Sequence, residues 1–336
     1  MESLSLETAM PDALPPPDLA DRLRRGDRRA LAQAITLVES TRSDHRARAT
    51  DLLAELLPHT GKAVRIGISG VPGVGKSTFI EAFGLHVIGQ GHKVAVLAID
   101  PTSQRTGGSI LGDKTRMEIL SRDPLAFIRP SPAGGTLGGV ARRTREAMLL
   151  VEAAGFDVVI VETVGVGQSE TAVADMVDLF LLLLPPAGGD ELQGIKKGIV
   201  ELADLIVVNK ADGDLAAAAR HAEAEYRHAL SMLRPTNPSW RVPVLSCSAL
   251  MQKGIDLVWE MIGTYRETLG ANGDITRRRA EQARAWMWSE IQDNLLDAFR
   301  RDPGVRAELP GLEKATAAGA ITPGAAARRL LDLFRP

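Results

Sequence analysis

The segment Gly70–Ser77 has the sequence Gly-Val-Pro-Gly-Val-Gly-Lys-Ser and fits the pattern G-x-x-x-x-G-K-[ST]. An apolar run, Val64–Ser69, precedes it and a helical segment, Ser77–Gly89, follows it. In this context the glycines let main-chain N–H groups surround phosphates, Lys76 reaches the β and γ phosphates, and the Ser77 hydroxyl binds Mg²⁺. A glycine-rich turn that matches by chance is the alternative. The residues expected at the nucleotide phosphates are Gly70, Gly73, Val74, Gly75, Lys76, Ser77 and Thr78.

The order of segments around this loop predicts the fold class. Short β-rich runs alternate with helical segments, which indicates an α/β P-loop NTPase fold with a mostly parallel sheet covered by helices on both faces. Ligands of such sheets bind at the carboxyl ends of the strands. The expected strands are Val64–Ser69, Lys93–Asp100, Asp157–Glu162, Leu179–Leu184, Leu205–Asn209 and Val242–Ser246. The expected helices between them are Ser77–Gly89, Thr136–Ala154, Gln193–Leu202 and Leu215–Leu233.

Helical arms are expected on both sides of this α/β region. Apolar spacing predicts a helix over Asp27–Glu39, and a second begins with Ser43 as its N-cap. From Thr276 the chain is again helical, and a Pro/Gly-punctuated piece, Pro303–Gly311, leads to a last amphipathic helix around Leu330–Phe334. The predicted domains are an N-terminal tail and helical arm (1–60), a nucleotide-binding domain (61–270) and a C-terminal helical arm (271–336).

A second motif, Asn209-Lys-Ala-Asp, follows the apolar run Leu205–Val208. The carboxylate of Asp212 can accept two hydrogen bonds from the guanine N1–H and exocyclic amine, and adenine offers no such pair of donors. We expect Lys210 along the base plane and Asn209 between this loop and the phosphate loop. The motif predicts selection of GTP over ATP.

A third segment supports the base site. Ser246-Cys-Ser-Ala follows the last predicted strand, and backbone groups of Ser248 and Ala249 are expected to touch the guanine O6. A serine-rich turn without a base contact is the alternative.

Carboxylates near the phosphate loop suggest how Mg²⁺ is held. Glu162 ends a buried strand, and Gly165 follows it. In P-loop GTPases the acidic residue linked to Mg²⁺ and the glycine that senses the γ-phosphate have these two positions. Glu replaces the more usual Asp here, and a capping or solvent-facing Glu is the alternative. Asp100 ends the second strand and Asp113 lies in the polar loop after it, so both are candidates for the metal region. The alternative for these two is a loop or capping role.

The residue after Gly165 is Val166, where small Ras-like GTPases place the glutamine that orients the attacking water. A valine side chain cannot polarise water, so we expect slow intrinsic hydrolysis that another group or a partner completes. Gln168, Lys196 and Lys197 are the candidates nearby. The last two lie in a glycine-punctuated segment that can move, with an exposed helix start as the alternative.

Composition narrows the partners and the compartment. The net charge of −2 gives no footprint for nucleic acid or an anionic membrane. The single Cys247 excludes an intrachain disulfide, and the six histidines show no metal-ligand spacing. The longest apolar stretch is under half the roughly 20 residues of a membrane span, and the N-terminus lacks a signal- or transit-peptide pattern. These features predict a cytoplasmic protein.

Taken together, the motifs resemble the GTPase chaperones of cobalamin-dependent acyl-CoA mutases, the MeaB/ArgK-like family of methylmalonyl-CoA mutase-associated GTPases. The similar segments cover most of residues 61–215, and the helical arms match in placement, with Trp286-Met-Trp288 as the recognisable anchor of the C-terminal arm. They are Gly70–Thr78, Ala98–Ser103, Arg105–Met117, Phe127–Pro132, Gly135–Val140, Glu162–Asp175, Gly189–Gly198 and Asn209–Asp212.

This resemblance implies a homodimer in which the C-terminal arm makes much of the contact. It implies that GTP and GDP, with Mg²⁺, gate the loading of adenosylcobalamin onto an acyl-CoA mutase and the removal of spoiled cofactor. By position, Ser77, Asp100, Asp113 and Glu162 form the Mg²⁺ and switch set. Lys196 falls in a third switch loop that responds to the partner.

Three other functions stay open. A kinase that phosphorylates a transport protein needs a phosphoacceptor site, and nothing in the sequence demands one. A nickel metallochaperone GTPase usually has a His-rich or Cys-paired site, against which the lone cysteine and scattered histidines argue. A non-enzymatic scaffold is the third. GTP turnover with and without a cobalamin-dependent mutase separates these from a chaperone.

Overall fold

The computed structural model describes residues 19–99, 117–130, 137–163, 169–186, 197–232, 235 and 237–334. The chain divides into two compact units, Met1–Arg279 and Ala280–Pro336. The first unit contains the sheet, and the second is helical where it is described. None of the helices in these ranges combines the length and the apolar character needed to cross a membrane.

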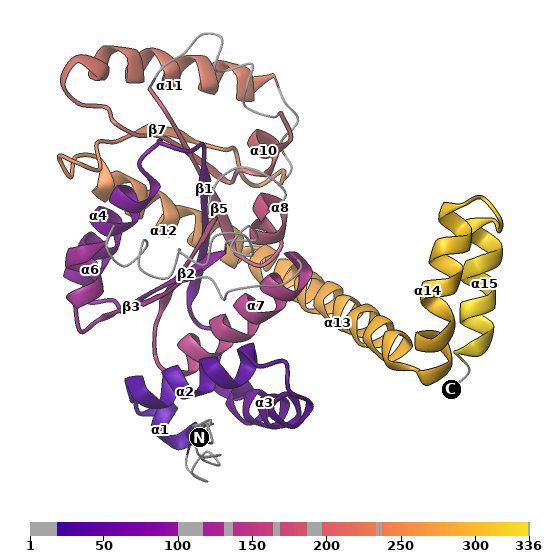
Figure 1. Ribbon diagram of the computed structural model, residues 1–336. Helices are drawn as coiled ribbons and strands as arrows, with labels where there is room; N and C mark the ends of the chain where they lie inside the picture. The colour runs from indigo at the N-terminus through magenta and orange to yellow at the C-terminus, as the bar shows by residue number, and fades with distance from the viewer. Residues whose placement is uncertain are drawn as a thin grey trace, which may run out of the picture. The chain divides into compact units, whose positions relative to one another are not determined.

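Within the described residues, seven strands form one sheet in the order β3-β2-β4-β1-β5-β6-β7, and every neighbouring pair is parallel (Figure 1). β1 lies at the centre and places Ile68 beside Glu162 of β4 and Gly70 beside Leu183 of β5. The predicted parallel α/β sheet is confirmed. The strands are β1 (Val64–Gly70), β2 (Val94–Ile99), β3 (Ala126–Arg129), β4 (Val158–Thr163), β5 (Leu179–Leu184), β6 (Leu205–Val208) and β7 (Val244–Ser246).

Helices cover both faces of the sheet, because strands buried on both sides alternate their side chains between two cores. On one face, Phe79, Phe83 and Val258 pack against β1, β2, β4 and β5. On the other, Ala219 and Tyr226 pack against β5 and β6. The first face carries α4 (Lys76–Gly89), α6 (Glu118–Arg122) and α12 (Ile255–Ala271). The second carries α7 (Leu137–Ala153), α8 (Ser169–Ala174), α10 (Lys197–Leu202) and, after the short η2 (Gly213–Leu215), α11 (Ala216–Ser231).

One strand was not expected from the sequence. β3 is four residues long, lies at the edge of the sheet and pairs only with β2, with Phe127 beside Ala95. Pro124 and Pro130 flank it, and proline favours turns and strand ends over strand interiors. The remaining strands begin and end within two residues of their predicted bounds.

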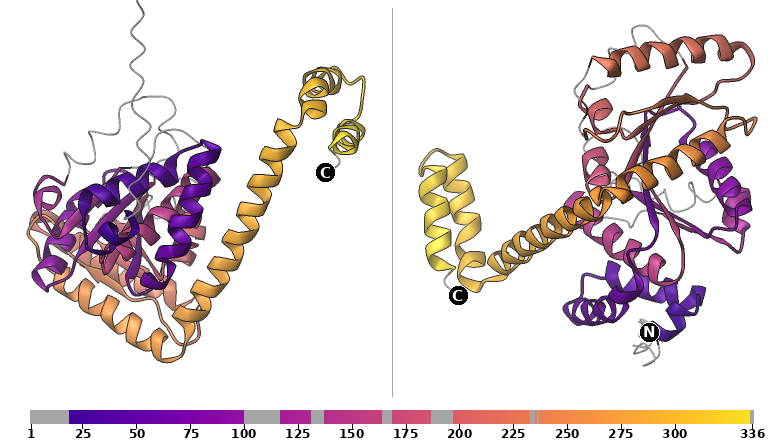
Figure 2. Two further views of the ribbon diagram at one scale, coloured as in Figure 1. Left: turned by 90° about the horizontal axis from the view of Figure 1, so that it is seen from below. Right: turned by 180° about the vertical axis from the view of Figure 1, so that it is seen from behind.

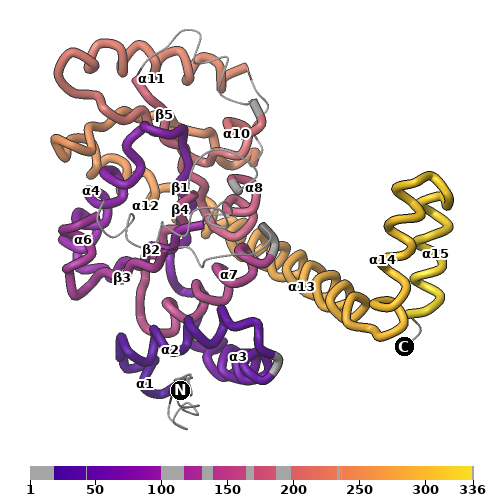
Figure 3. Tube along the Cα trace, in the orientation of Figure 1, coloured from indigo at the N-terminus to yellow at the C-terminus, as the bar shows by residue number. Residues whose placement is uncertain are grey.

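From residue 19 to residue 59 the N-terminal region has three α-helices where two were expected. They are α1 (Leu19–Arg24), α2 (Arg28–Glu39) and α3 (Ser43–Leu56), followed by η1 (Leu57–His59). The Asp27 carboxylate caps α2 by accepting from the N–H groups of Arg29 and Ala30 at 2.8 and 3.2 Å. The helix expected to use Ser43 as N-cap instead includes Ser43 as its first residue, with Arg42 at the cap position. All three helices contact α7 (Figure 3).

Gly273, with φ of 71°, separates α12 from α13 (Asp274–Arg301), and Figure 2 shows the two as distinct helices. The Pro/Gly-punctuated piece Pro303–Gly311 belongs to a helix, α14 (Pro303–Ala317). Asp302 caps it by accepting from Val305 N–H at 2.9 Å, and a proline at the first helical position is compatible with this start. A last helix, α15 (Pro323–Leu333), packs on α14. The residues buried between them are Val305, Leu312, Ala326 and Leu330.

Candidate nucleotide-binding site

The loop between β1 and α4 is shaped by glycines. Gly73 and Gly75 have φ of 79° and 91°, in the left-handed region that favours glycine. A Cβ on Gly75 would lie 2.9 Å from Asn209 Nδ2, and one on Gly70 would lie 2.5 Å from the Leu183 carbonyl oxygen. The loop therefore needs glycine both for its backbone angles and for its close approach to two neighbouring segments.

This loop opens onto the start of α4, where the first N–H groups of a helix have no partner within the helix. These donors and the positive end of the helix suit a phosphate group. Val74 anchors the loop in the core, whereas Ser77 is half-buried and Thr78 exposed. Lys76 Nζ donates to the Gly70 carbonyl oxygen at 2.7 Å, so its ammonium group turns back over the loop. The cradle has the backbone donors and the positive charge that a triphosphate needs.

Asn209, directly after β6, connects three segments. Its Nδ2 donates to the Val74 carbonyl oxygen at 3.0 Å, and its Oδ1 accepts from Ala249 N–H at 3.1 Å. The side chain is buried. Asn209 thus joins the phosphate loop to the 209–212 loop and to the segment after β7.

Lys210 makes a second connection between the same loops. Its backbone is left-handed, with φ of 62°, and its Nζ donates to the Gly73 carbonyl oxygen at 2.7 Å. The aliphatic part of the side chain therefore runs from the 209–212 loop to the phosphate loop. A base placed beside Asp212 would lie against this stem.

The Asp212 carboxylate is oriented by Ser248. Ser248 Oγ donates to Asp212 Oδ1 at 2.6 Å and accepts from Met251 N–H at 3.1 Å. The turn that carries Ser248 is closed by two hydrogen bonds of 3.0 Å between the main chains of Ser248 and Lys253. Ser248 was expected to act through its backbone, and the structure gives its side chain the further task of positioning the carboxylate.

Cys247 also belongs to this region, which the sequence motifs did not indicate. Its Sγ lies 3.6 Å from Asn209 Oδ1, and its carbonyl oxygen accepts from Ala211 N–H at 2.9 Å. Burial raises the pKa of the thiol to about 12, so the group stays protonated and neutral. Its position inside the segment Ser246–Ala249 was the available signal.

Oxygen donors lie at the carboxyl ends of β1 and β4. Glu162 is 5% exposed, and in the sheet it lies beside Ile68 of β1 and Ala98 of β2. Thr163 Oγ1 donates to Ser69 Oγ at 2.8 Å, and both residues are fully buried. A carboxylate and the hydroxyl of Ser77 are hard oxygen ligands, which is the chemistry that Mg²⁺ selects. These residues fit a magnesium site at this edge.

Five predicted site residues lie outside the described residues: Asp100, Asp113, Gly165, Gln168 and Lys196. In the ranges that the structure describes, no group of three or more His, Cys, Asp or Glu side chains is placed to hold a metal ion.

The family model described as "Methylmalonyl Co-A mutase-associated GTPase MeaB" matches residues 31–304. The chain belongs to the MeaB family. As a MeaB-family GTPase it binds guanine nucleotides, and its sheet is that of the P-loop NTPases.

Relatives of this MeaB-family chain cover nearly all of it. A protein from Caulobacter vibrioides is 62% identical over 316 residues, 94% of this chain and 97% of that protein. The "Methylmalonic aciduria type A homolog, mitochondrial" of Mus musculus is 51% identical over 323 residues, 93% of this chain and 78% of that protein. A solved structure described as a "LAO/AO transport system kinase" is 41% identical with a TM-score of 0.74, covering 95% of this chain and 97% of that one.

Proposed function

We propose that this GTPase is a chaperone of an adenosylcobalamin-dependent acyl-CoA mutase, methylmalonyl-CoA mutase or a close relative, in the cytoplasm. GTP binding and hydrolysis gate cofactor loading and protect or reactivate the mutase. The observation that supports the nucleotide site is the position of Asn209, which joins the phosphate loop to both base-site segments. The description of the family and the name of the mouse relative support a mutase as partner.

In this proposal the nucleotide lies along the carboxyl edge of the sheet. The phosphates meet the Gly70–Thr78 loop, and the guanine meets Asp212, which Ser248 orients. Ser77 and Glu162, together with Asp100 and Asp113, would hold Mg²⁺. When bound, the ion neutralises charge on the phosphates. Lys76 adds a positive charge from the protein at the same end.

Hydrolysis is slow without the partner in this account, because Val166 replaces the glutamine that orients water in small GTPases. Gln168 and Lys196 are the proposed groups that the partner brings into position. Lys196 directly precedes α10, so a change in its segment is passed to a helix that packs on α8 and β5.

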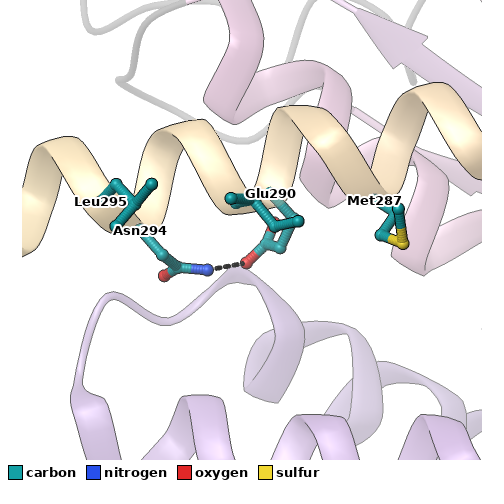
Figure 4. Close-up of a pocket in the computed structure, with 5 residues that line it drawn as sticks. Met287, Glu290, Asn294 and Leu295 are labelled. Atoms are coloured by element: carbon teal, nitrogen blue, oxygen red, sulfur yellow. Dashed lines mark hydrogen bonds between the residues drawn. The ribbon is translucent and has the colours of Figure 1, made fainter.

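The C-terminal helices, in the proposed arm 271–336, form the homodimer contact. α13 carries exposed apolar side chains, with Trp288 and Leu295 more than half exposed. Figure 4 shows the shallow, mainly apolar pocket on this helix, where Asn294 Nδ2 donates to Glu290 Oε1 at 2.9 Å. Its lining residues are Met287, Glu290, Ile291, Asn294 and Leu295. Apolar side chains gathered on one exposed helix suit burial against a second copy.

GTP turnover measured alone and with a purified adenosylcobalamin-dependent acyl-CoA mutase tests the proposal. We expect strong stimulation by the mutase, and Lys196→Ala should keep nucleotide affinity while losing all stimulation. Lys62→Ala, an exposed lysine that lies before β1 at the opposite edge of the sheet, is the matched control. An unchanged turnover would contradict the chaperone function. Transfer of labelled γ-phosphate to a transport protein would instead support the kinase function for which the solved relative is named.

A further inference from the structure

Two consecutive arginines near the start of α13 bond residues at the amino edge of the sheet, opposite the candidate nucleotide site. Arg278 and Arg279 lie in the first two turns of this helix, before the boundary of the first unit. Their guanidinium groups reach the end of α8 and the residues that precede β1, β5 and β6. One short helical segment is thereby bonded to four elements of the nucleotide-binding unit.

Arg278 bonds the last residue of α8 and a residue that lies between α10 and β6. Its Nη1 donates to Asp204 Oδ2 and to the Tyr265 hydroxyl, both at 3.1 Å, and its Nη2 donates to the Ala174 carbonyl oxygen at 3.4 Å. Ala174 is the last residue of α8, where a positive charge is favourable. Asp204 lies between α10 and β6 and also accepts from Phe180 N–H at 2.8 Å.

Arg279 bonds Asp178, which lies in the connection between α8 and β5. Its Nε and Nη2 donate to the two oxygens of Asp178 at 2.7 and 2.6 Å, a bidentate pair in which the carboxylate is buried. Nη2 also donates to the Ala63 carbonyl oxygen at 2.7 Å, directly before β1. Tyr265 completes the cluster by donating its hydroxyl to the Asp178 carbonyl oxygen at 2.8 Å.

α8 and α10 connect this cluster to the other edge of the sheet. α8 begins at Ser169, directly after the segment of Gly165 and Gln168, and α10 begins directly after Lys196. α8 packs tightly on β1, since a Cβ on Gly67 would lie 2.7 Å from Val173 Cγ1 of α8. It would also lie 3.0 Å from Val177 Cγ2, in the segment that joins α8 to β5. A packed interface of this kind transmits a displacement instead of absorbing it. Movement at the beginning of α8 therefore reaches Ala174 and Asp178, where the arginines are bonded.

We propose that Arg278 and Arg279 form a relay that couples the nucleotide state to α13, the helix that runs into the C-terminal unit. The relay rests on the proposed function in one respect, namely that GTP binding and hydrolysis displace α8 and α10. Coupling of this kind is reciprocal, so whatever holds α13 in one arrangement changes the relative affinities for GTP and GDP. Both arginines are positioning residues that act through α8 and the residues before β5 and β6.

Amide hydrogen exchange of the full chain, with GDP and with a non-hydrolysable GTP analogue, tests the relay without any substitution. We expect the exchange of residues 274–282 and of α8 to differ between the two nucleotide states. If both nucleotides bind and exchange at 274–282 is the same in the two states, the relay is overturned while the nucleotide site stands. If neither nucleotide binds, the proposed function fails as well.

The variant Arg278→Gln distinguishes coupling between the nucleotide state and α13 from a purely structural role of this arginine. We expect it to keep the difference at α8, lose the difference at 274–282, and change the ratio of the two nucleotide affinities about fivefold or more. A purely structural arginine would weaken protection equally in both states and leave that ratio unchanged, which would overturn the relay. Arg277→Gln is the matched control, because that guanidinium is exposed and bonded to Asp274 of its own helix. Arg278→Lys, which keeps the charge, should restore part of the coupling.

Discussion

The two edges of the sheet use polar groups in opposite ways. At the amino edge, Asp157, Asp178 and Asp204 each directly precede a strand and accept from the N–H of a residue in or beside another strand, at 2.7, 3.0 and 2.8 Å. At the carboxyl edge, glycines shape the loop that leads into α4. Side chains such as Asn209 donate to backbone carbonyl oxygens of other loops. The first edge satisfies its charges within the protein, and the second leaves donors for a ligand.

The same difference appears in the ion pairs. Arg65 Nε donates to Glu152 Oε1 at 2.6 Å in a buried pair, and Arg279 binds the buried Asp178. A buried pair costs stability when one partner is removed, because the other charge remains in a medium of low dielectric constant. We therefore expect substitutions at the amino edge to lower the free energy of unfolding and to leave the preference for guanine over adenine unchanged. Substitutions at the carboxyl edge should instead lower the affinity for guanine nucleotides.

The largest expected effect is on stability at the amino edge. Asp178→Ala removes the partner of Arg279 and the acceptor for Arg65 N–H, so the free energy of unfolding should fall by about 3 kcal/mol. Urea denaturation measures this. The preference for guanine over adenine nucleotide should persist in the folded protein, and loss of that preference would break the division between the edges.

Asp212→Asn should have the next largest effect, now on binding. The amide cannot accept from both guanine donors, so the affinity for GDP should fall about 100-fold. The preference of the site should move toward xanthine nucleotide. Titration calorimetry with GDP and XDP measures the change, and the unfolding midpoint should barely move. Asp214→Asn, which changes an exposed carboxylate of η2 two residues further along, is the control. Unchanged GDP affinity would refute the base contact.

Ser248→Ala should weaken GDP binding about tenfold, the cost of one hydrogen bond that orients a charged group. Fluorescence titration with a labelled guanine nucleotide is sensitive enough for this change. Ser231→Ala removes an exposed hydroxyl that bonds its own helix at His228 and should have no effect. Equal affinities for the two variants would mean that Ser248 does not position Asp212.

The smallest expected effect sharpens the comparison within the amino edge. Asp157 holds the equivalent place before β4, but its side chain is half exposed and pairs with His92 at 2.7 Å. Because solvent screens such a pair, Asp157→Ala should lower the free energy of unfolding by about 1 kcal/mol or less. If Asp157→Ala lowers the free energy of unfolding as much as Asp178→Ala does, burial of the carboxylate does not determine the size of the effect.

The fold was predictable where local pattern and tertiary packing agree. β5 is an unbroken apolar run and has its predicted bounds, Leu179–Leu184. β3 could not be predicted because a four-residue edge strand between prolines has little local signal. The helix α14 was not predicted, because Pro310 lies inside it and proline disfavours helix interiors. The Asp302 cap and the packing of Leu312 on α15 stabilise it.

At the candidate site, the sequence indicated the contiguous motifs but not how their side chains meet. Nothing local shows that Ser248 Oγ turns to Asp212, because this depends on the Met251 N–H and on the turn closed by Lys253. The arginine cluster was invisible for the same reason, since Arg279 and Asp178 are 101 residues apart. Long-range pairing of charged side chains leaves no periodic pattern in a sequence.

We infer that the carboxyl edge of this sheet binds a guanine nucleotide through Asp212 and the glycine loop. Titration of the full chain with GDP and with ADP, in the presence of Mg²⁺, tests it most directly. We predict binding of GDP with an affinity at least about 100-fold greater than that of ADP, because adenine leaves the carboxylate unpaired. Equal affinities, or no binding of GDP, would contradict the account.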